Sequence, residues 1–288
     1  MTALHAFDGG FTLALGGGGA RGWAHVGVAR ALDERGLRPR RIVGTSMGAI
    51  VGAALAAGRS PDNIEAGALR APMHRLMVKR GRFALFDPRQ MLEHLAAELG
   101  DPLIEDLPTP LGITAYDLVA GAPRLITRGR LIDALEISIA VPFFFPPRRD
   151  GNGVWCDAGP WEAIPVTLAR AWDPSLPVIG VFADIPKPAF LSSRVGAMFL
   201  RAVARRLGVG TADERLTARR YLGLLTSRWA DPVVRQPPDL FIAPRLGRMN
   251  ALQFSRISEA IAVGERDARL ALATIEAPSS SEALAHAG

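Results

Sequence analysis

Cysteine is almost absent from this chain of 288 residues, in which Cys156 is the only one. No intrachain disulfide can form, and such a composition favours a reducing compartment. Residues 1–10 lack a basic stretch followed by an apolar core, so no signal peptide is expected. The longest apolar run, residues 42–57, is too short and too rich in glycine for a membrane span. The sequence therefore predicts a cytoplasmic protein.

Lysine is scarce as well, because arginine supplies all but two of the 34 basic residues, while the net charge is +6. Codon composition alone would explain this bias, and attraction to an anionic lipid surface is the functional alternative. Residues 70–82, where apolar and basic side chains alternate at helical spacing, are the best candidate for a peripheral contact at the inner membrane surface. Neither a nucleic-acid-binding motif nor metal-ligand spacing is present, so we expect no nucleic acid, metal or other cofactor.

Short β-rich runs alternate with helical patterns along the chain, which predicts a parallel-type sheet between helices. The later β-rich runs are residues 111–115, 124–127, 178–182 and 240–243, and the expected C-terminal helices are 192–206, 212–226 and 251–274. A chain of this length that is 49% hydrophobic can bury its core as one domain. We place that domain at residues 1–275 and expect residues 276–288 to form a disordered tail.

One serine lies in a turn that glycines flank on both sides. Gly44-Thr45-Ser46-Met47-Gly48 follows a β-rich run at residues 41–43 and precedes a small-residue helix at 49–57. G-x-S-x-G at a strand-to-helix turn is the nucleophile elbow of serine hydrolases. Gly44 and Gly48 would let the backbone turn sharply and lift the hydroxyl clear of the sheet. The pattern predicts that Ser46 is a nucleophile.

A second glycine cluster, residues 16–22, follows a buried strand at 11–15 and precedes a helix at 23–35, for which Gly36 is the expected C-cap. Backbone N–H groups and the helix dipole converge at such a turn and favour anions. A Walker A loop would need G-K-[ST] after the glycines, and this chain lacks it. A dinucleotide site would need an acidic residue after the next strand, where the chain has the Ser46 elbow. An oxyanion hole beside Ser46 is the better interpretation.

A serine nucleophile requires a base. In an α/β-hydrolase an acid and then a histidine follow the serine, but only His286 lies in the second half of this chain, within the expected tail. His25, His74 and His94 match no motif, and His25 is interpreted as a packing residue in an apolar helix. Asp157 is the better partner, because it ends a short apolar strand and would reach the same edge of the sheet.

Together these features resemble the patatin-like phospholipases over roughly residues 12–182. That family has a G-G-G-x-R-G loop after the first strand, G-x-S-x-G after the second, and D-G-[AG] later. The matching residues are Gly17-Gly18-Gly19-Ala20-Arg21-Gly22, Gly44-Thr45-Ser46-Met47-Gly48 and Asp157-Ala158-Gly159. The resemblance implies a three-layer α/β/α sandwich with a mainly parallel central sheet.

The resemblance also implies a Ser46–Asp157 dyad, in which Ser46 attacks an ester carbonyl and Asp157 takes the proton. The N–H groups of Gly17, Gly18 and Gly19 would hold the oxyanion, and water would then hydrolyse the acyl-enzyme. A dry, apolar setting would raise the pKa of Asp157 from its ordinary value of about 3.9 into the range of a useful base.

Three further positions are expected to support the site. They are Arg21, Gly22 and Gly159. Arg21 would either brace the glycine loop through backbone carbonyls or face a lipid phosphate. Ala158 stands where the family usually has glycine, and it would strain the turn if that position needs a positive φ. Residues 136–147, which contain three consecutive phenylalanines, would either line an acyl channel or belong to the core.

The expected function is that of a serine lipid acyl hydrolase of the phospholipase A or lysophospholipase type. Its substrates would be phospholipids, lysophospholipids or other acyl esters. A general carboxylesterase or thioesterase with the same dyad is the alternative enzyme. A regulatory protein that keeps the fold but turns over little is the alternative outside catalysis.

Overall fold

The computed structural model describes residues 6–70, 78–79, 86–141, 144–151, 153–183 and 235–276. The strands are β1 (Phe11–Leu15), β2 (Pro39–Gly44), β3 (Val78–Lys79), β4 (Phe86–Asp87), β5 (Leu111–Asp117), β6 (Ala122–Ile126), β7 (Arg148–Asp150), β8 (Gly153–Cys156), β9 (Val178–Val181) and β10 (Leu240–Ile242). The helices are η2 (Gly19–Trp23), α1 (Ala24–Asp33), α2 (Met47–Ala56), α3 (Pro61–Arg70), α5 (Arg89–Leu99), η3 (Ile104–Asp106), α6 (Leu131–Ser138), α7 (Val166–Trp172) and α10 (Ile257–Glu276).

The main sheet has eight strands, in the order β10-β9-β1-β2-β5-β8-β7, with β6 also paired to β5. The strands from β10 to β5 run parallel to one another. At the other end, β6 and β8 both run antiparallel to β5, and β7 runs antiparallel to β8. The predicted mainly parallel sheet is therefore confirmed, with an antiparallel end that the sequence pattern did not indicate.

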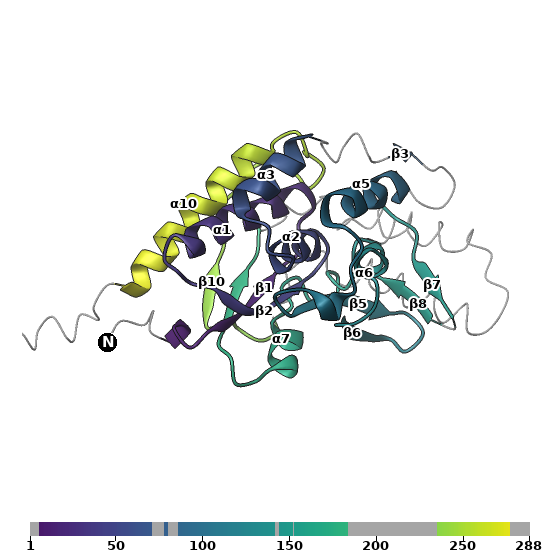
Figure 1. Ribbon diagram of the computed structural model, residues 1–288, viewed down its shortest axis with the longest axis horizontal. Helices are drawn as coiled ribbons and strands as arrows, with labels where there is room; N and C mark the ends of the chain where they lie inside the picture. The colour runs from purple at the N-terminus through teal and green to yellow at the C-terminus, as the bar shows by residue number, and fades with distance from the viewer. Residues whose placement is uncertain are drawn as a thin grey trace, which may run out of the picture.

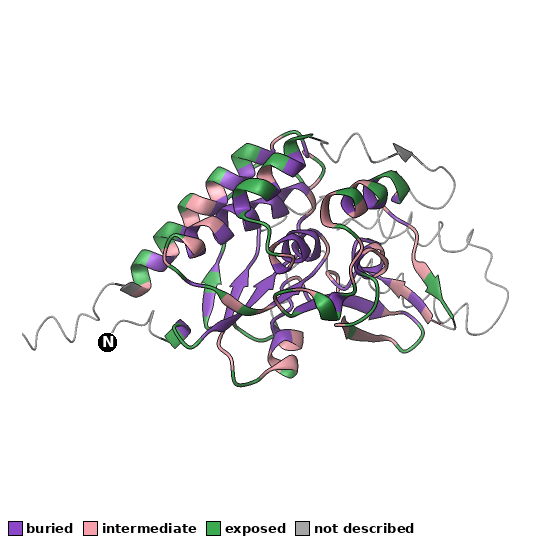
Figure 2. Cartoon of the chain, viewed as in Figure 1, coloured by how far each residue is buried: buried purple, intermediate pink, exposed green. Residues whose placement is uncertain are grey.

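Helices cover both faces of the sheet, so the architecture is the predicted three-layer α/β/α sandwich (Figure 1). The larger apolar core lies between the sheet and α1, α2 and α10, and a smaller one lies beneath α7. Every residue of β1 and β9 is buried, as is typical of parallel strands covered on both faces. Figure 2 shows this burial in the central strands and along α2, which is the helix that follows Ser46.

The predicted strands are confirmed to within two residues at their ends, and Gly36 adopts the positive φ of +68° expected of a C-cap. The last helix begins at Ile257 instead of residue 251. The side chain of Asn250 accepts a hydrogen bond from the Leu252 N–H at 2.9 Å and holds the chain in a turn there. The expected helices 192–206 and 212–226, and the expected tail beyond Glu276, lie outside the described residues.

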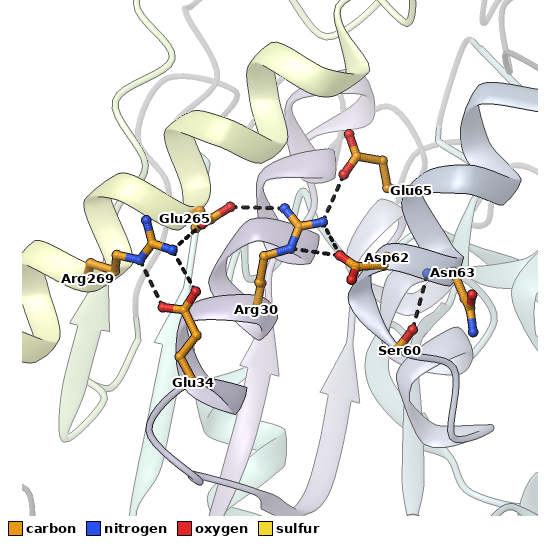
Figure 3. Close-up of polar contacts among 8 residues, drawn as sticks. All are labelled: Arg30, Glu34, Ser60, Asp62, Asn63, Glu65, Glu265 and Arg269. Atoms are coloured by element: carbon orange, nitrogen blue, oxygen red, sulfur yellow. Dashed lines mark hydrogen bonds and ion pairs between the residues drawn. The ribbon is translucent and has the colours of Figure 1, made fainter.

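An ion-pair network on the solvent side joins α1, α3 and α10 (Figure 3). Its charged members are Arg30, Glu34, Asp62, Glu65, Glu265 and Arg269. Arg30 is central, because its guanidinium lies 2.6 Å from Asp62 and 3.0 Å from Glu265. Networks of partly exposed charges stabilise a fold only modestly. The packing of α10 must therefore contribute more than these ion pairs to holding the helix in place.

Helices α1 and α10 cross with their backbones in contact. A Cβ added to Gly27 would lie 1.9 Å from the Ile261 carbonyl oxygen, and one added to Gly264 would lie 2.1 Å from the Ala24 carbonyl oxygen. Real Cβ atoms do not approach so closely, so the two glycines set the distance between the helices. Because Ala24 directly follows η2, this crossing also fixes the helix behind the glycine loop.

We expect Gly264→Ala to lower the free energy of unfolding by about 1–3 kcal/mol, since the methyl group forces α10 away from α1. Helix propensity alone would favour alanine by about 1 kcal/mol, so a measured loss isolates the packing effect. Urea denaturation of the variant and of wild type measures the change in the free energy of unfolding. Ala262→Val, on the exposed side of the same helix, is the matched control and should change stability by less than about 1 kcal/mol. A more stable Gly264→Ala variant would contradict the close crossing.

Candidate active site

Ser46 lies between β2 and α2 in a conformation that L-residues rarely adopt. Its φ is 54° and its ψ is −121°, and within the described residues it is the only non-glycine residue with a positive φ. Such a conformation costs about 1–3 kcal/mol and persists only where the surroundings enforce it. A Cβ on Gly44 would lie 2.5 Å from the Ala49 Cα, and one on Gly48 would lie 2.3 Å from the Leu15 carbonyl oxygen. Both glycines are therefore required by close contact.

Ser138, at the end of α6, holds the strained turn from the other side. Its buried hydroxyl accepts a hydrogen bond from the Ser46 backbone N–H at 2.9 Å. Below the turn, the Thr114 hydroxyl of β5 donates to the Thr45 hydroxyl at 2.8 Å. The sequence alone assigned no role to Ser138. Its function depends on a contact between residues 92 positions apart, which no local pattern reveals.

Ser138→Ala removes the acceptor for the Ser46 N–H, and a donor left without a partner costs about 1–3 kcal/mol. We expect a lower melting temperature and a fall in kcat of about tenfold, which corresponds to about 1.4 kcal/mol of lost positioning. Ser258→Ala, at an exposed position of α10, is the control. Unchanged kcat and melting temperature in the Ser138 variant would show that the elbow holds its conformation without this bond.

The glycine loop lies directly beside Ser46. A Cβ added to Gly17 would lie 3.6 Å from the Ser46 Cβ. The N–H of Gly17, however, donates to the Ala163 carbonyl at 3.1 Å, so it is not available to an oxyanion. Gly18 and Gly19 have φ values of 153° and 55°, and no acceptor within the described residues bonds to their N–H groups. The expected set of three donors is thereby reduced to Gly18 and Gly19.

Arg21 braces this loop from beneath. It is buried, and its guanidinium donates to the carbonyl oxygens of Gly247 (3.2 Å) and Met249. Of the two roles considered for Arg21, this geometry favours the brace over a contact with lipid phosphate. The neighbouring Ala20 N–H donates to the Ala251 carbonyl at 2.8 Å. Residues 247–251, which precede α10, thus secure the loop in a way that its sequence did not indicate.

Two further residues fix the loop against α1 and α2. A Cβ on Gly22 would lie 2.4 Å from the Met47 Cγ, so glycine there allows the loop to contact the elbow helix. The Nε2 of His25 donates to the Gly16 carbonyl at 2.8 Å. Burial lowers the pKa of His25 to about 4, and the Gly16 carbonyl opposes this shift, so the ring is neutral at pH 7. His25 was predicted to pack; it also orients the glycine loop.

Asp157 reaches Ser46 because β8 runs antiparallel to β5. Cys156 lies opposite Tyr116 near the end of β5, and the chain then runs back along β5 toward the level of Thr114 and Thr45. Asp157 was expected to reach the same edge of the sheet as Ser46. The antiparallel β8 approaches from beyond that edge and brings the carboxylate to the elbow.

Asp157 is 2% exposed, and its carboxyl group has two hydrogen-bonding partners. The Gly159 N–H donates to its Oδ1 at 2.6 Å, and the Ser46 side chain is the second partner. Burial raises the pKa of Asp157 to about 6, and hydrogen bonds with Gly159 and Ser46 oppose that rise. A carboxylate of this pKa is ionised at pH 7 and is a much better base than a solvated one.

Ala158 does not strain the turn, because its φ is not positive and the methyl group is buried in a small cluster with Cys156. Gly159 is the residue that needs to be small: a Cβ there would lie 2.9 Å from the Asp157 Oδ1. The condition under which Ala158 would strain the turn, a positive φ, is thus not met.

The described part of residues 136–147 belongs largely to the core. Ile137, Ile139 and Phe145 are buried, and the ring of Phe144 stacks on that of Phe86 with centroids 6.4 Å apart. These contacts favour the core interpretation over an acyl channel. Pro142 and Phe143 lie outside the described residues, as does His74. Within the described ranges, no group of three His, Cys, Asp or Glu side chains could hold a metal ion.

A strained serine, a glycine loop and a buried aspartate at the edge of an α/β sandwich form the arrangement that is typical of a serine hydrolase. A family model described as "Patatin-like phospholipase" matches residues 13–170. The chain therefore belongs to the patatin-like phospholipase family, and the resemblance drawn from its three motifs is confirmed.

Two curated relatives come from Mycobacterium tuberculosis, and both are uncharacterized NTE family proteins. One is 35% identical over 183 residues, which are 60% of this chain and 46% of that protein. The other is 30% identical over 276 residues, which are 90% of this chain and 46% of that protein. The chain thus spans about half the length of these relatives. The crystal structure of VipD from Legionella pneumophila shares the fold, with a TM-score of 0.54 at 14% identity, and the match covers 92% of this chain and 66% of that one.

Proposed function

We propose that this protein is a serine lipid acyl hydrolase that cleaves fatty-acyl esters through a Ser46–Asp157 dyad. The observation that carries the proposal is the Asp157 carboxyl, which is buried against the Ser46 side chain and has a pKa near 6. Membership of the patatin-like phospholipase family supports lipid esters as the substrate class. Phospholipids and lysophospholipids are the substrates we expect.

In the acylation step, the Ser46 Oγ attacks the ester carbonyl carbon while its proton moves to the Asp157 carboxylate. The carbonyl oxygen becomes an oxyanion, which accepts hydrogen bonds from the N–H groups of Gly18 and Gly19. When the intermediate collapses, the bond to the alcohol breaks and Asp157 returns the proton to that leaving group. The products of this step are the free alcohol and an acyl-Ser46.

In the deacylation step, a water molecule gives one proton to Asp157 as its oxygen attacks the acyl carbon. The same N–H groups hold the second oxyanion. Collapse of this intermediate breaks the bond to the Ser46 Oγ, which recovers the proton from Asp157, and the fatty acid leaves. One carboxyl group thus serves both steps as base and then acid, as microscopic reversibility requires.

We also propose that residues 1–275 act as a single domain that works at an anionic membrane surface on the cytoplasmic side. Within the described ranges, every helix is too short or too polar to cross a bilayer. The proposal of a surface contact rests on the excess of arginine, because residues 71–77 and 80–82 of the candidate patch lie outside the described part.

A turnover panel tests the proposal: p-nitrophenyl butyrate and palmitate, a lysophospholipid and a diacyl phospholipid, each assayed with wild type and Ser46→Ala. We expect fatty acid release from at least one lipid, and none above background with the variant. Turnover of short esters alone would favour the general carboxylesterase. Absence of turnover on the whole panel in folded protein would favour the regulatory alternative and contradict the proposal.

A further inference from the structure

A pocket of about 400 Å³ lies between α2, α3 and α5, apart from Ser46 and Asp157. Its buried walls are almost entirely apolar, since they consist of Trp23, Ile50, Val51, Ala54, Ile64, Gly67, Ala68 and Leu95. Pockets of this size and character are large enough to enclose a ligand. Because these buried residues offer few polar groups, the part of a ligand that lies against them must itself be apolar.

The remaining lining residues are polar in the main and mark the mouth of the pocket. Arg59, Asn63 and Arg70 are exposed, while His94 and Glu98 are half-buried. The Arg70 guanidinium lies 2.7 Å from the Glu98 carboxylate, whereas Arg59 donates to the Glu98 backbone carbonyl at 3.0 Å. A carbonyl carries no net charge, so the described lining residues of the mouth have one positive charge in excess, which would favour an anion there.

The position of Arg59 is fixed by the end of α2. Gly58 adopts a φ of +78°, and the Arg59 N–H donates to the Ala54 carbonyl at 3.0 Å, so the backbone turns there and ends the helix. Lining residues along α2 extend from Ile50 to Ala54, over roughly 6 Å at 1.5 Å per residue, and Arg59 follows just beyond the end of the helix. An apolar wall with a cation at the open end suits an apolar chain with an anionic head.

Trp23 is a further buried residue of the lining. It is 5% exposed, it lines the pocket, and its indole N–H has no acceptor within the described residues. Buried indole N–H groups usually have a partner. Trp23 also ends η2 and directly follows the glycine loop, so a ligand in the pocket would contact the residue after that loop and the elbow helix α2.

We propose that this pocket binds a single-chain anionic amphiphile, with the chain against Ile50, Ile64 and Leu95 and the head group at Arg59. A fatty-acid carboxylate and the phosphate of a single-chain lipid share this chemistry. The site is separate from Ser46, and the proposal does not depend on the hydrolase activity.

Calorimetric titration of the full chain tests the proposal, with each ligand below its micelle concentration. Dodecanoate should bind at least tenfold more tightly than octanoate, because each buried methylene contributes about a fourfold gain in affinity. It should also bind at least tenfold more tightly than dodecanol, and dodecyltrimethylammonium should not bind. Dodecyl phosphate distinguishes a fatty-acid carboxylate from a lipid phosphate as the natural head group. Tighter binding of dodecyl phosphate than of dodecanoate would identify the lipid phosphate.

Two alanines of α3 provide a matched pair of variants. Ala68 lines the pocket, while Ala66 is exposed and does not. Ala68→Phe should weaken dodecanoate binding at least tenfold, and Ala66→Phe should leave it unchanged. Arg59→Gln should weaken the binding of dodecanoate but not that of dodecanol. Equal binding of the anionic, neutral and cationic ligands by wild type would overturn the proposal even if Ala68→Phe does not fold. Full binding by a folded Ala68→Phe variant would overturn it as well.

Discussion

Ser46→Ala should lower the hydrolysis of p-nitrophenyl esters by at least about 10⁴-fold, the scale on which a serine hydrolase loses kcat when its nucleophile is removed. The expectation rests on the strained φ of 54° at Ser46, on Asp157 beside its side chain, and on the glycine loop next to its Cβ. A fluorophosphonate probe should label the wild-type protein, and peptide mapping should place the adduct on Ser46.

The control variant is Ser258→Ala, which changes an exposed serine of α10 and should keep full activity and labelling. The melting temperature of Ser46→Ala should stay close to that of wild type, because the methyl group fits the same turn. A labelled Ser46→Ala variant, or one that retains a tenth of the wild-type rate, would assign the chemistry to another residue.

The elbow and the glycine loop could be predicted because short-range geometry dictates their sequences. Gly44, Gly48 and Gly22 each stand where a Cβ would overlap a neighbouring atom, and Gly19 has a positive φ as well. Glycine is nearly the only residue that tolerates such positions, so the constraint is visible in the sequence. The fully buried strands β1 and β9 left an equally clear signal in their continuous apolar runs.

The features that could not be predicted depend on contacts between distant segments. Ser138 reaches the Ser46 N–H from α6, and Arg21 bonds to carbonyl groups more than 200 positions away in the chain. The antiparallel direction of β8 is a property of the sheet, and a four-residue strand carries no sign of its direction. The Gly17 N–H is engaged by Ala163, although nothing in the loop's own sequence distinguishes Gly17 from Gly18.

Asp157→Asn should lower kcat by about 10² or more, because the amide keeps the shape of the side chain but cannot accept the Ser46 proton. The amide oxygen can still accept the Gly159 N–H, so the turn should be preserved. Asp117→Asn is the matched control, since it makes the same change on the adjacent strand β5, opposite Trp155 of β8. In wild type, kcat/KM should rise with pH through about 6 and level off above pH 7, as the carboxyl ionises.

Stability should show the opposite pH dependence, because the same burial that raises the pKa of Asp157 penalises its charged form. In the unfolded chain this carboxyl ionises near 3.8, and in the folded protein near 6, so the folded state binds more protons between these values. Wild-type stability should therefore fall as pH rises from about 4 to 6, by on the order of 3 kcal/mol in total. Asp157→Asn lacks this loss, so above pH 6 it should be at least as stable as wild type while nearly inactive.

Melting temperatures of wild type and Asp157→Asn between pH 4 and 8, together with kcat/KM over the same range, separate the dyad from its alternatives. If a histidine were the base, the folded variant His25→Gln or His94→Gln would be as inactive as Asp157→Asn. His25 is a poor candidate because its Nε2 is held by the Gly16 carbonyl and its pKa is near 4. If Asp157→Asn kept its activity, Asp157 would not be the base. If the variant lost as much stability as wild type between pH 4 and 6, Asp157 would not be the group whose ionisation changes the stability. A less active but more stable variant is the result expected of a carboxylate buried for its chemistry.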